Sequence, residues 1–522
     1  MAAYEQHDGQ AAHSGCCGCT SCGAGELSRR DFLKAGSVAL GGVAMTGLSW
    51  PALAGENPGL PRPPARKELV VQPILTYAIP RRRNQTSWRS WGGIQTEQHA
   101  EAEVKRIGGE LRKLATGADF PVRFLDVARA RSANDIQKAL DAAKDADVYV
   151  IYAAGGGMGL FDPVVKTGKH VIFFCRHRSG PVYLWYEIIS PRYLRQHTDK
   201  LAVEGVDYED VVVDSPAELQ WRLRALGGLK NALGTKIVAI GGASGWGPSG
   251  RPAPDHCRNQ WKYEIHEVAY PDLAKLLRAA MTDKKALKLA EDRTAAYLDD
   301  KTVKLETGRD FVRNAFVLEQ VFRALMAKAG ANALTVNHCM GTIMPISKTT
   351  ACLPLSTLND AGYMAFCESD FVIIPAGVLL SCISGRPNFL NDPTYPHDGV
   401  ITLAHCTAPR RMNGKDLEPA RIVTHFESDY GAAPKVEMRK GQEVTLVMTD
   451  FAATRWTGLP GKIADAPFLP ICRSQIDVAY KVEDQLLAER MTGFHWEVLY
   501  GDCLREMGYA LKKTPIGWQR LG

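Results

Sequence analysis

Two carboxylates and one imidazole in the last third of the chain are the residues best suited to chemistry. Glu368 follows an apolar stretch that ends at Cys367, Asp392 lies in a loop, and His495 opens an alternating stretch that ends at Tyr500. Such a set is rich in oxygen and suits Mn²⁺, and also Mg²⁺ or Co²⁺, with positions open for substrate oxygens. These three residues are therefore candidate ligands for a divalent metal, although their spacing alone is not specific for one. Taken singly, each residue also fits a structural role, as a helix cap, a turn residue and a strand residue respectively.

The surroundings of Glu368 predict a strand followed by a helix. The apolar run before Cys367 resembles a buried strand, and 371–383 is apolar and helical in pattern. Ser369 or Asp370 would be a good N-cap for this helix. Glu368 would then stand at a strand end facing a helix N-terminus, which is where α/β sheets place ligands.

The stretch around His495 alternates with a period of two. This alternation places His495 and Glu497 on one face of a strand, and Trp496 on the other. An imidazole that binds a metal usually donates its second N–H to an acceptor. Glu497 is therefore a candidate to orient the His495 ring.

The rest of the chain predicts three domains after an N-terminal leader. Strand-like runs alternate with helical stretches of 10–15 residues, and this pattern restarts near Pro216, which indicates two parallel sheets. From about Gly385 short alternating runs dominate, which indicates β-structure. The predicted fold class is α/β, with two Rossmann-like parallel-sheet βα domains followed by a largely β C-terminal domain. The expected segments are a signal peptide at 1–54, a linker at 55–66, and domains at 67–210, 211–385 and 386–522.

The N-terminal segment has the pattern of a twin-arginine export leader. Arg29 and Arg30 precede Phe32 and Leu33, and an apolar run and small residues ending at Ala54 follow. We expect the twin-arginine translocation machinery to carry the folded chain to the periplasm or the exterior, where it would be soluble. The alternative is an uncleaved leader that anchors the chain. A cysteine cluster at Cys16, Cys17, Cys19 and Cys22 lies before the cleavage site and is expected to be discarded.

The charge and the glycine spacing argue against a nucleic-acid-binding protein and against a dinucleotide-binding enzyme. The net charge of +6 on 522 residues is mild and the basic residues are scattered, so no nucleic-acid footprint is expected. Glycine clusters at 155–157 and 241–242 follow strand-like runs but do not form the dinucleotide fingerprint. The cysteines beyond the leader lie mostly in apolar runs and are expected to be buried small hydrophobes.

Several motifs resemble the L-fucose/L-arabinose isomerase-like superfamily. They lie at 335–341, 352–362, 367–370, 385–392, 404–409, 425–431 and 493–502. The resemblance implies Mn²⁺ held by Glu368, Asp392 and His495, with the two carboxylates as acid and base in aldose–ketose isomerisation through an ene-diolate. It further implies trimers or hexamers, and it makes His405 a candidate second histidine.

Weaker candidates and other reactions stay open. Arg82 and Arg83 follow the first strand and could hold substrate oxygens, or form a solvated basic loop. His425 and Glu427 match a motif of the superfamily, and Trp496 could stack on a sugar or belong to the core. The familiar isomerases are cytoplasmic, so the leader leaves open an epimerase or lyase acting on a modified sugar. A non-catalytic carbohydrate-binding protein is the third possibility.

Overall fold

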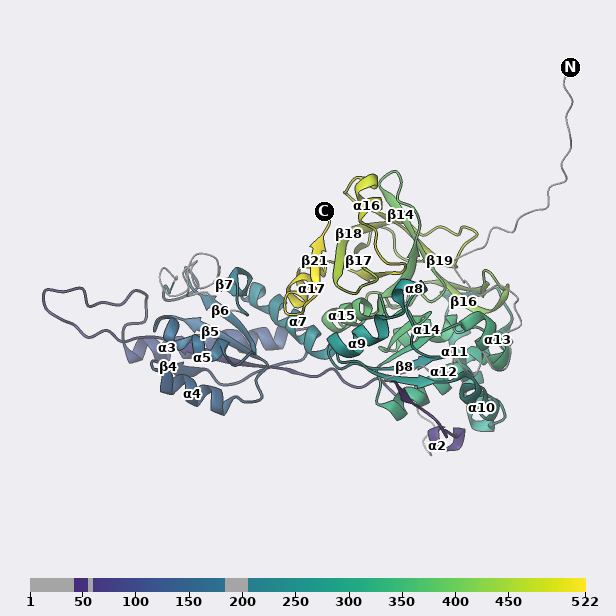
Figure 1. The fold of residues 1–522 in the computed structure, drawn as a ribbon, viewed down its shortest axis with the longest axis horizontal. Coiled ribbons are helices and arrows are strands. Elements are labelled where there is room, and N and C mark those ends of the chain that lie inside the picture. Colours follow the sequence, from purple (N-terminus) through teal and green to yellow (C-terminus); the bar gives the residue numbers. More distant parts are fainter. Residues whose placement is uncertain (1–41, 55–59, 184–204) are drawn as a thin grey trace, which may run out of the picture. The chain divides into compact units, whose positions relative to one another are not determined.

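The computed structural model describes residues 42–54, 60–183 and 205–522 (Figure 1). The first domain is built on a parallel sheet in the order β3-β2-β5-β6-β7, with β4 pairing on β2. Its strands are β2 (Leu69–Thr76), β3 (Val122–Phe124), β4 (Ala128–Ala130), β5 (Val148–Ala153), β6 (His170–Cys175) and β7 (Val211–Val213). Its helices are α3 (Glu97–Gly117), α4 (Ala133–Ala142) and α5 (Asp162–Val165). The sheet runs past the expected boundary at residue 210, because β7 pairs with β6.

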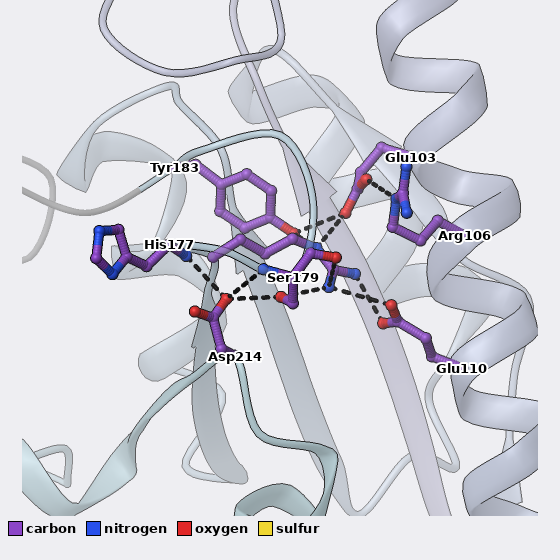
Figure 2. A network of polar contacts seen from close by, with 8 residues as sticks. Glu103, Arg106, Glu110, His177, Ser179, Tyr183 and Asp214 are labelled. Carbon is purple, nitrogen blue, oxygen red and sulfur yellow. Dashed lines mark hydrogen bonds and ion pairs between the residues drawn. The ribbon is translucent and has the colours of Figure 1, made fainter.

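A buried arginine, Arg176, ties the loop after β6 to Glu103 and Glu110 of α3, and these two glutamates are labelled in Figure 2. The Arg176 guanidinium is fully buried and donates to Glu103 at 2.6 Å and to Glu110 at 2.7 Å. Asp214, beyond the end of β7, accepts bonds from the backbone N–H of His177 and from the Ser179 side chain. The two glutamates compensate the buried positive charge of Arg176, so this network has a structural role.

The second domain contains a five-stranded parallel sheet in the order β1-β9-β8-β11-β12. Its strands are β1 (Val43–Ala44), β8 (Lys236–Ile240), β9 (Glu264–Val268), β11 (Ala333–Val336) and β12 (Met364–Cys367). The helices are α7 (Pro216–Ala232), α8 (Gly247–Gly250), α9 (Ala253–Gln260), α10 (Tyr270–Ala280), α11 (Lys284–Asp299), α12 (Arg309–Ala329), α13 (Cys339–Ser347), α14 (Cys352–Asp360) and α15 (Ile374–Ser384). Helix α12 ends at Gly330 in the left-handed region, a common helix terminator.

The last part of the chain is largely β-structure and closes into a barrel. Six strands form the ring in the order β17-β20-β13-β14-β19-β18, which closes because β17 also pairs with β18, and β21 adds to the sheet by pairing in parallel with β18. They are β13 (Phe389–Pro393), β14 (Val400–His405), β17 (Glu443–Thr449), β18 (Arg455–Asp465), β19 (Ser474–Ala479), β20 (Trp496–Tyr500) and β21 (Gly517–Arg520). Beside it, β10 (Val303–Leu305), β15 (Ala420–His425) and β16 (Tyr430–Val436) form a smaller sheet, and α16 (Asp484–Arg490) and α17 (Leu504–Leu511) complete the region. The predicted fold class, two parallel-sheet domains followed by a largely β domain, is confirmed.

Two local predictions differ from the structure. Helix α15 begins at Ile374 and is preceded by turns, and neither Ser369 nor Asp370 is its N-cap. Asp392 was expected in a loop, but it lies in strand β13, because that segment pairs with β14 and β20 in the barrel. The chain is therefore extended at Asp392, and its side-chain direction is set by the barrel.

Most of the expected leader lies outside the described residues, including the arginine pair and the four early cysteines. Its described end contains β1, which pairs with β9, and the short helix α2 (Trp50–Ala54). Trp50 is buried and donates to Asp283 at 2.8 Å. In the described part of the chain, no helix combines the length and the apolar character needed to span a membrane. Cleavage of the leader stays a prediction.

Candidate metal centre

Glu368 stands at the carboxyl end of β12, on a turn with an unusual backbone. Glu368 and Ser369 both adopt left-handed conformations, with φ of 62° and 49°. Such conformations cost about 1–3 kcal/mol each at non-glycine residues and persist where the surroundings impose them. The Ser369 N–H donates to Thr335 Oγ1 on the neighbouring strand at 3.1 Å, which holds the turn. The strained turn places the Glu368 carboxylate beside two histidines of the barrel.

Three adjacent barrel strands supply the other members of the site. His405 is the last residue of β14, and Asp392 on β13 lies opposite Ala404 of β14. Asn391 pairs with Trp496 of β20, so Asp392 and His495 occupy neighbouring positions at the end of that ladder. The barrel register therefore brings together side chains from three separate segments.

The distances show a convergent cluster. Glu368 lies 3.7 Å from Nε2 of His405 and 3.4 Å from Nε2 of His495, and Asp392 Oδ1 lies 3.3 Å from the same His495 atom. The side chains of Glu368 and Asp392 are 38% and 24% exposed, whereas those of the histidines are at most 4% exposed. The carboxylates thus face the accessible side of the site and the imidazoles form its buried wall.

Three atoms of this cluster are buried and lack a hydrogen-bond partner among the described residues. They are Asp392 Oδ1, His405 Nε2 and His495 Nε2. Ligand atoms of these three residues all lie within 4.8 Å of one another, and Cys367, Glu368 and His405 form a second such group. Buried polar groups almost always have partners. One oxygen and two ring nitrogens converging without partners fit the requirements of a bound metal ion.

A carboxylate behind the site orients His495. Asp370 Oδ2 lies 2.8 Å from His495 Nδ1, and Asp370 Oδ1 accepts the backbone N–H groups of Trp246 and Val372. When the ring is neutral and donates Nδ1–H to Asp370, the lone pair of Nε2 faces the cluster and is available to a cation. The expectation that Glu497 orients this ring is therefore wrong.

Glu497 is instead buried against helix α15. Both carboxyl oxygens lack hydrogen-bond partners among the described residues, and burial raises the pKa of Glu497 well above its usual value. A Cβ added at Gly377 of α15 would lie 2.6 Å from Glu497 Oε1, so this glycine makes room for the carboxyl group. Burial between the barrel and the helix therefore favours the neutral acid form of Glu497.

The two carboxylates of the cluster differ in their affinity for protons. Burial raises the pKa of Glu368, but contacts with His405 and His495 outweigh it and hold this pKa well below its usual value. Burial also raises the pKa of Asp392, and there it prevails over the nearby histidines. For His495, burial favours the neutral ring, but the bond to Asp370 and the nearby negative charges of Glu368 and Asp392 outweigh it and raise the pKa well above its usual value. The cluster therefore separates an ionised carboxylate from one that retains a proton more readily.

The weaker sequence candidates lie in different environments. Trp496 is 1% exposed and belongs to the core, so its ring offers no face to a ligand. His425 is buried at the end of β15, where its ring contacts Cys406 and Ser428, and Glu427 is exposed in the following turn. Arg82 and Arg83 are exposed in a loop of the first domain.

Sequence reasoning missed the aromatic side chain that packs on the site. The ring of Trp246 stacks on Phe494 with centroids 3.8 Å apart, and meets the His495 ring edge-on at 5.5 Å. The glycine-rich turn before Trp246 marks a strand end of the second sheet, which was the available signal. Parallel sheets of α/β proteins bind ligands at the carboxyl ends of their strands, and the turn before Trp246 lies at such an end.

Comparison with known proteins adds no assignment: no family model and no curated protein matches the chain.

Proposed function

We propose that this protein is a metal-dependent sugar isomerase whose cation is held by Glu368, Asp392, His405 and His495. The observation that carries the proposal is the convergence, beside the Glu368 carboxylate, of three buried atoms that have no hydrogen-bond partner in the described part of the chain. Mixed carboxylate and imidazole donors suit Mn²⁺, with Mg²⁺ or Co²⁺ as related choices. When bound, the cation would polarise the adjacent carbonyl and hydroxyl oxygens of an open-chain sugar.

The two carboxylates then have separate tasks. Glu368 is the more exposed and has the lower pKa, so it is ionised and available to accept the proton from the carbon beside the carbonyl. Asp392 has a raised pKa and suits the transfer of a proton between the hydroxyl and carbonyl oxygens. Return of the carbon proton to the neighbouring carbon interconverts aldose and ketose without any net redox change.

The histidines hold position and take no part in proton transfer in this proposal. His495 is fully buried and fixed through Nδ1 by Asp370, and His405 contacts Thr407 through Nδ1 at 3.2 Å. Each ring therefore directs Nε2 into the cluster. Trp246 packs edge-on against the His495 ring and supports its position.

The proposal includes the cellular setting implied by the sequence. Export through the twin-arginine pathway would allow the cation to be bound before the chain leaves the cytoplasm. Assembly into trimers or hexamers follows from the resemblance, and light scattering on the purified chain measures it.

Metal binding is the first test. We expect the full chain, stripped with chelator, to bind about one Mn²⁺ per chain in calorimetric titration. Glu368→Gln and Asp392→Asn each replace a carboxyl ligand by an amide and should weaken binding, whereas Glu427→Gln, at an exposed carboxylate near His425, should leave it unchanged. Wild-type affinity in both site variants would show that the cluster is not the metal site.

The reaction is tested by deuterium transfer from solvent into a panel of aldoses, ketoses and glycosides. Deuterium at C2 together with ketose formation supports the isomerase. Inversion at the exchanged carbon identifies an epimerase, and loss of the aglycone identifies a lyase. Metal binding without exchange in any sugar would favour the carbohydrate-binding protein.

A further inference from the structure

Three cysteines from distant segments meet at one end of the barrel. Cys352 is the first residue of α14, Cys406 directly follows β14, and Cys472 lies shortly before β19. Strands β14 and β19 are antiparallel with His405 opposite Ser474, so Cys406 and Cys472 come to the same end of this strand pair. The three side chains pack with Ala433 as a small cluster separate from the main cores.

Cys406 is the centre of this thiol cluster, defined as Cys352, Cys406 and Cys472. Its sulfur is within hydrogen-bonding reach of the other two thiols and of the His425 ring. The backbone N–H of Arg473 also donates to Cys406 Sγ at 3.4 Å. Each of the two outer cysteines therefore has Cys406 as a sulfur partner.

Access to the cluster is graded. Cys352 and Cys406 are 5% and 2% exposed, whereas Cys472 is partly exposed. All three are thiols in the structure. Among the described residues, the three sulfur atoms of this cluster do not all lie within 4.8 Å of one another. A disulfide between two of the cysteines therefore fits the cluster better than one metal ion shared by all three.

We propose that the thiol cluster is a dithiol–disulfide relay that a small external disulfide oxidises through Cys472. The Cys472 sulfur attacks the external disulfide, forms a mixed disulfide and releases one small thiol, which takes the proton. The Cys406 sulfur then attacks the Cys472 sulfur and releases the second small thiol. Two protein thiols lose two electrons and two protons, and the external disulfide becomes two thiols.

An internal exchange completes the relay. The Cys352 sulfur attacks Cys406 in the Cys406–Cys472 disulfide, the Cys352–Cys406 bond forms, and Cys472 recovers its proton as a thiol. This exchange involves no further oxidant. It moves the disulfide to the two most buried positions, where reductants reach it slowly, and returns the accessible thiol to its starting state.

The test uses the full chain, reduced, desalted without air and incubated with oxidised glutathione. After quenching with N-ethylmaleimide, peptide mass mapping is expected to find Cys406 linked to Cys352 or Cys472. Because it uses neither metal nor sugar, failure of the relay is distinguishable from failure of the proposed isomerase.

Two variants test the order of events. Cys472→Ser should slow oxidation of Cys406 by about tenfold or more, because the accessible entry thiol is lost. Cys406→Ser should leave glutathione attached at Cys472 with no internal disulfide. Cys503→Ser, at a part-buried cysteine outside the cluster, is the matched control. In this variant Cys406 should be oxidised at the wild-type rate.

The proposal is overturned if all three cysteines of the wild-type protein remain alkylatable thiols, or if only a mixed disulfide at Cys472 accumulates. Oxidation of Cys406 at the wild-type rate in Cys472→Ser would overturn the entry role. If a variant does not fold, the wild-type map still decides whether the internal disulfide forms.

Discussion

Replacing Asp370 by asparagine tests how the site prepares His495 for a metal. Asp370 is 1% exposed, and its Oδ1 accepts the N–H groups of Trp246 and Val372 at 3.0 and 3.2 Å. In the variant the amide oxygen must stay with these two donors, so the amide NH₂ faces His495 Nδ1. The ring must then accept at Nδ1 and carry its proton on Nε2, the atom that faces Asp392 and Glu368.

The magnitude follows from this change of tautomer. Loss of a partner that orients a metal-binding histidine costs about 10–100-fold in metal affinity. In this variant the ligating nitrogen also carries a proton, so we expect the larger loss in this range. Mn²⁺ should bind roughly 100-fold more weakly, which is a loss of about 2.7 kcal/mol in binding free energy. The bond to the charged carboxylate is also lost, which should lower the free energy of unfolding by about 1.5–3 kcal/mol.

Calorimetric titration of the stripped protein with Mn²⁺ measures the affinity, and urea denaturation measures the stability. Asp214→Asn is the matched control, since Asp214 also accepts several backbone N–H groups but no bond from a histidine ring. The Asp214→Asn variant should bind Mn²⁺ with the affinity of the wild type. Unchanged affinity in a folded Asp370→Asn protein would refute the tautomer argument.

Two further predictions concern stability. Gly377→Ala would place a methyl group 2.6 Å from Glu497 Oε1, so urea denaturation should show a loss of about 1–3 kcal/mol, whereas Gly109→Ala, a helical glycine with open space at its Cβ, should not destabilise. Equal stabilities of these two variants would contradict the packing argument. Burial raises the pKa of Asp360 from 3.8 to about 7, so the unfolded state binds fewer protons between these values and this contribution to stability is lost as pH rises through them. Asp360→Asn should remove that part of the pH dependence in denaturation series from pH 4 to pH 7, and an unaltered slope would exclude the assignment.

Much of the fold was predictable because it depends on local patterns. Helix α4 is an example: Ser132 accepts the N–H of Asp135, and Asp135 bonds back in a capping box. The turn after β12 was harder, because Glu368 and Ser369 are held in left-handed conformations that their residue types do not favour. The helix that follows therefore begins later than its apolar pattern indicates.

The candidate site was likewise predictable only where it depends on local patterns. Alternation around His495 predicted a strand, but it did not reveal what Glu497 contacts, because both faces of β20 are buried. His405 was only a weak candidate, since its place beside Asp392 depends on the register between β13 and β14. Asp370 was taken for a helix cap, although it bonds to His495 from far along the sequence.

The sequence by itself determined the order of strands and helices, the two parallel sheets, the β-rich last domain and the residue types available for a metal. These features follow from hydrophobic periodicity over a few residues, which local sequence records. The resemblance grouped Glu368, Asp392, His405 and His495, but only the tertiary structure showed that their side chains meet and that Asp370 orients His495. The reason is physical: barrel closure and strand register depend on packing between segments far apart in the chain, and no local pattern encodes which buried polar groups will meet.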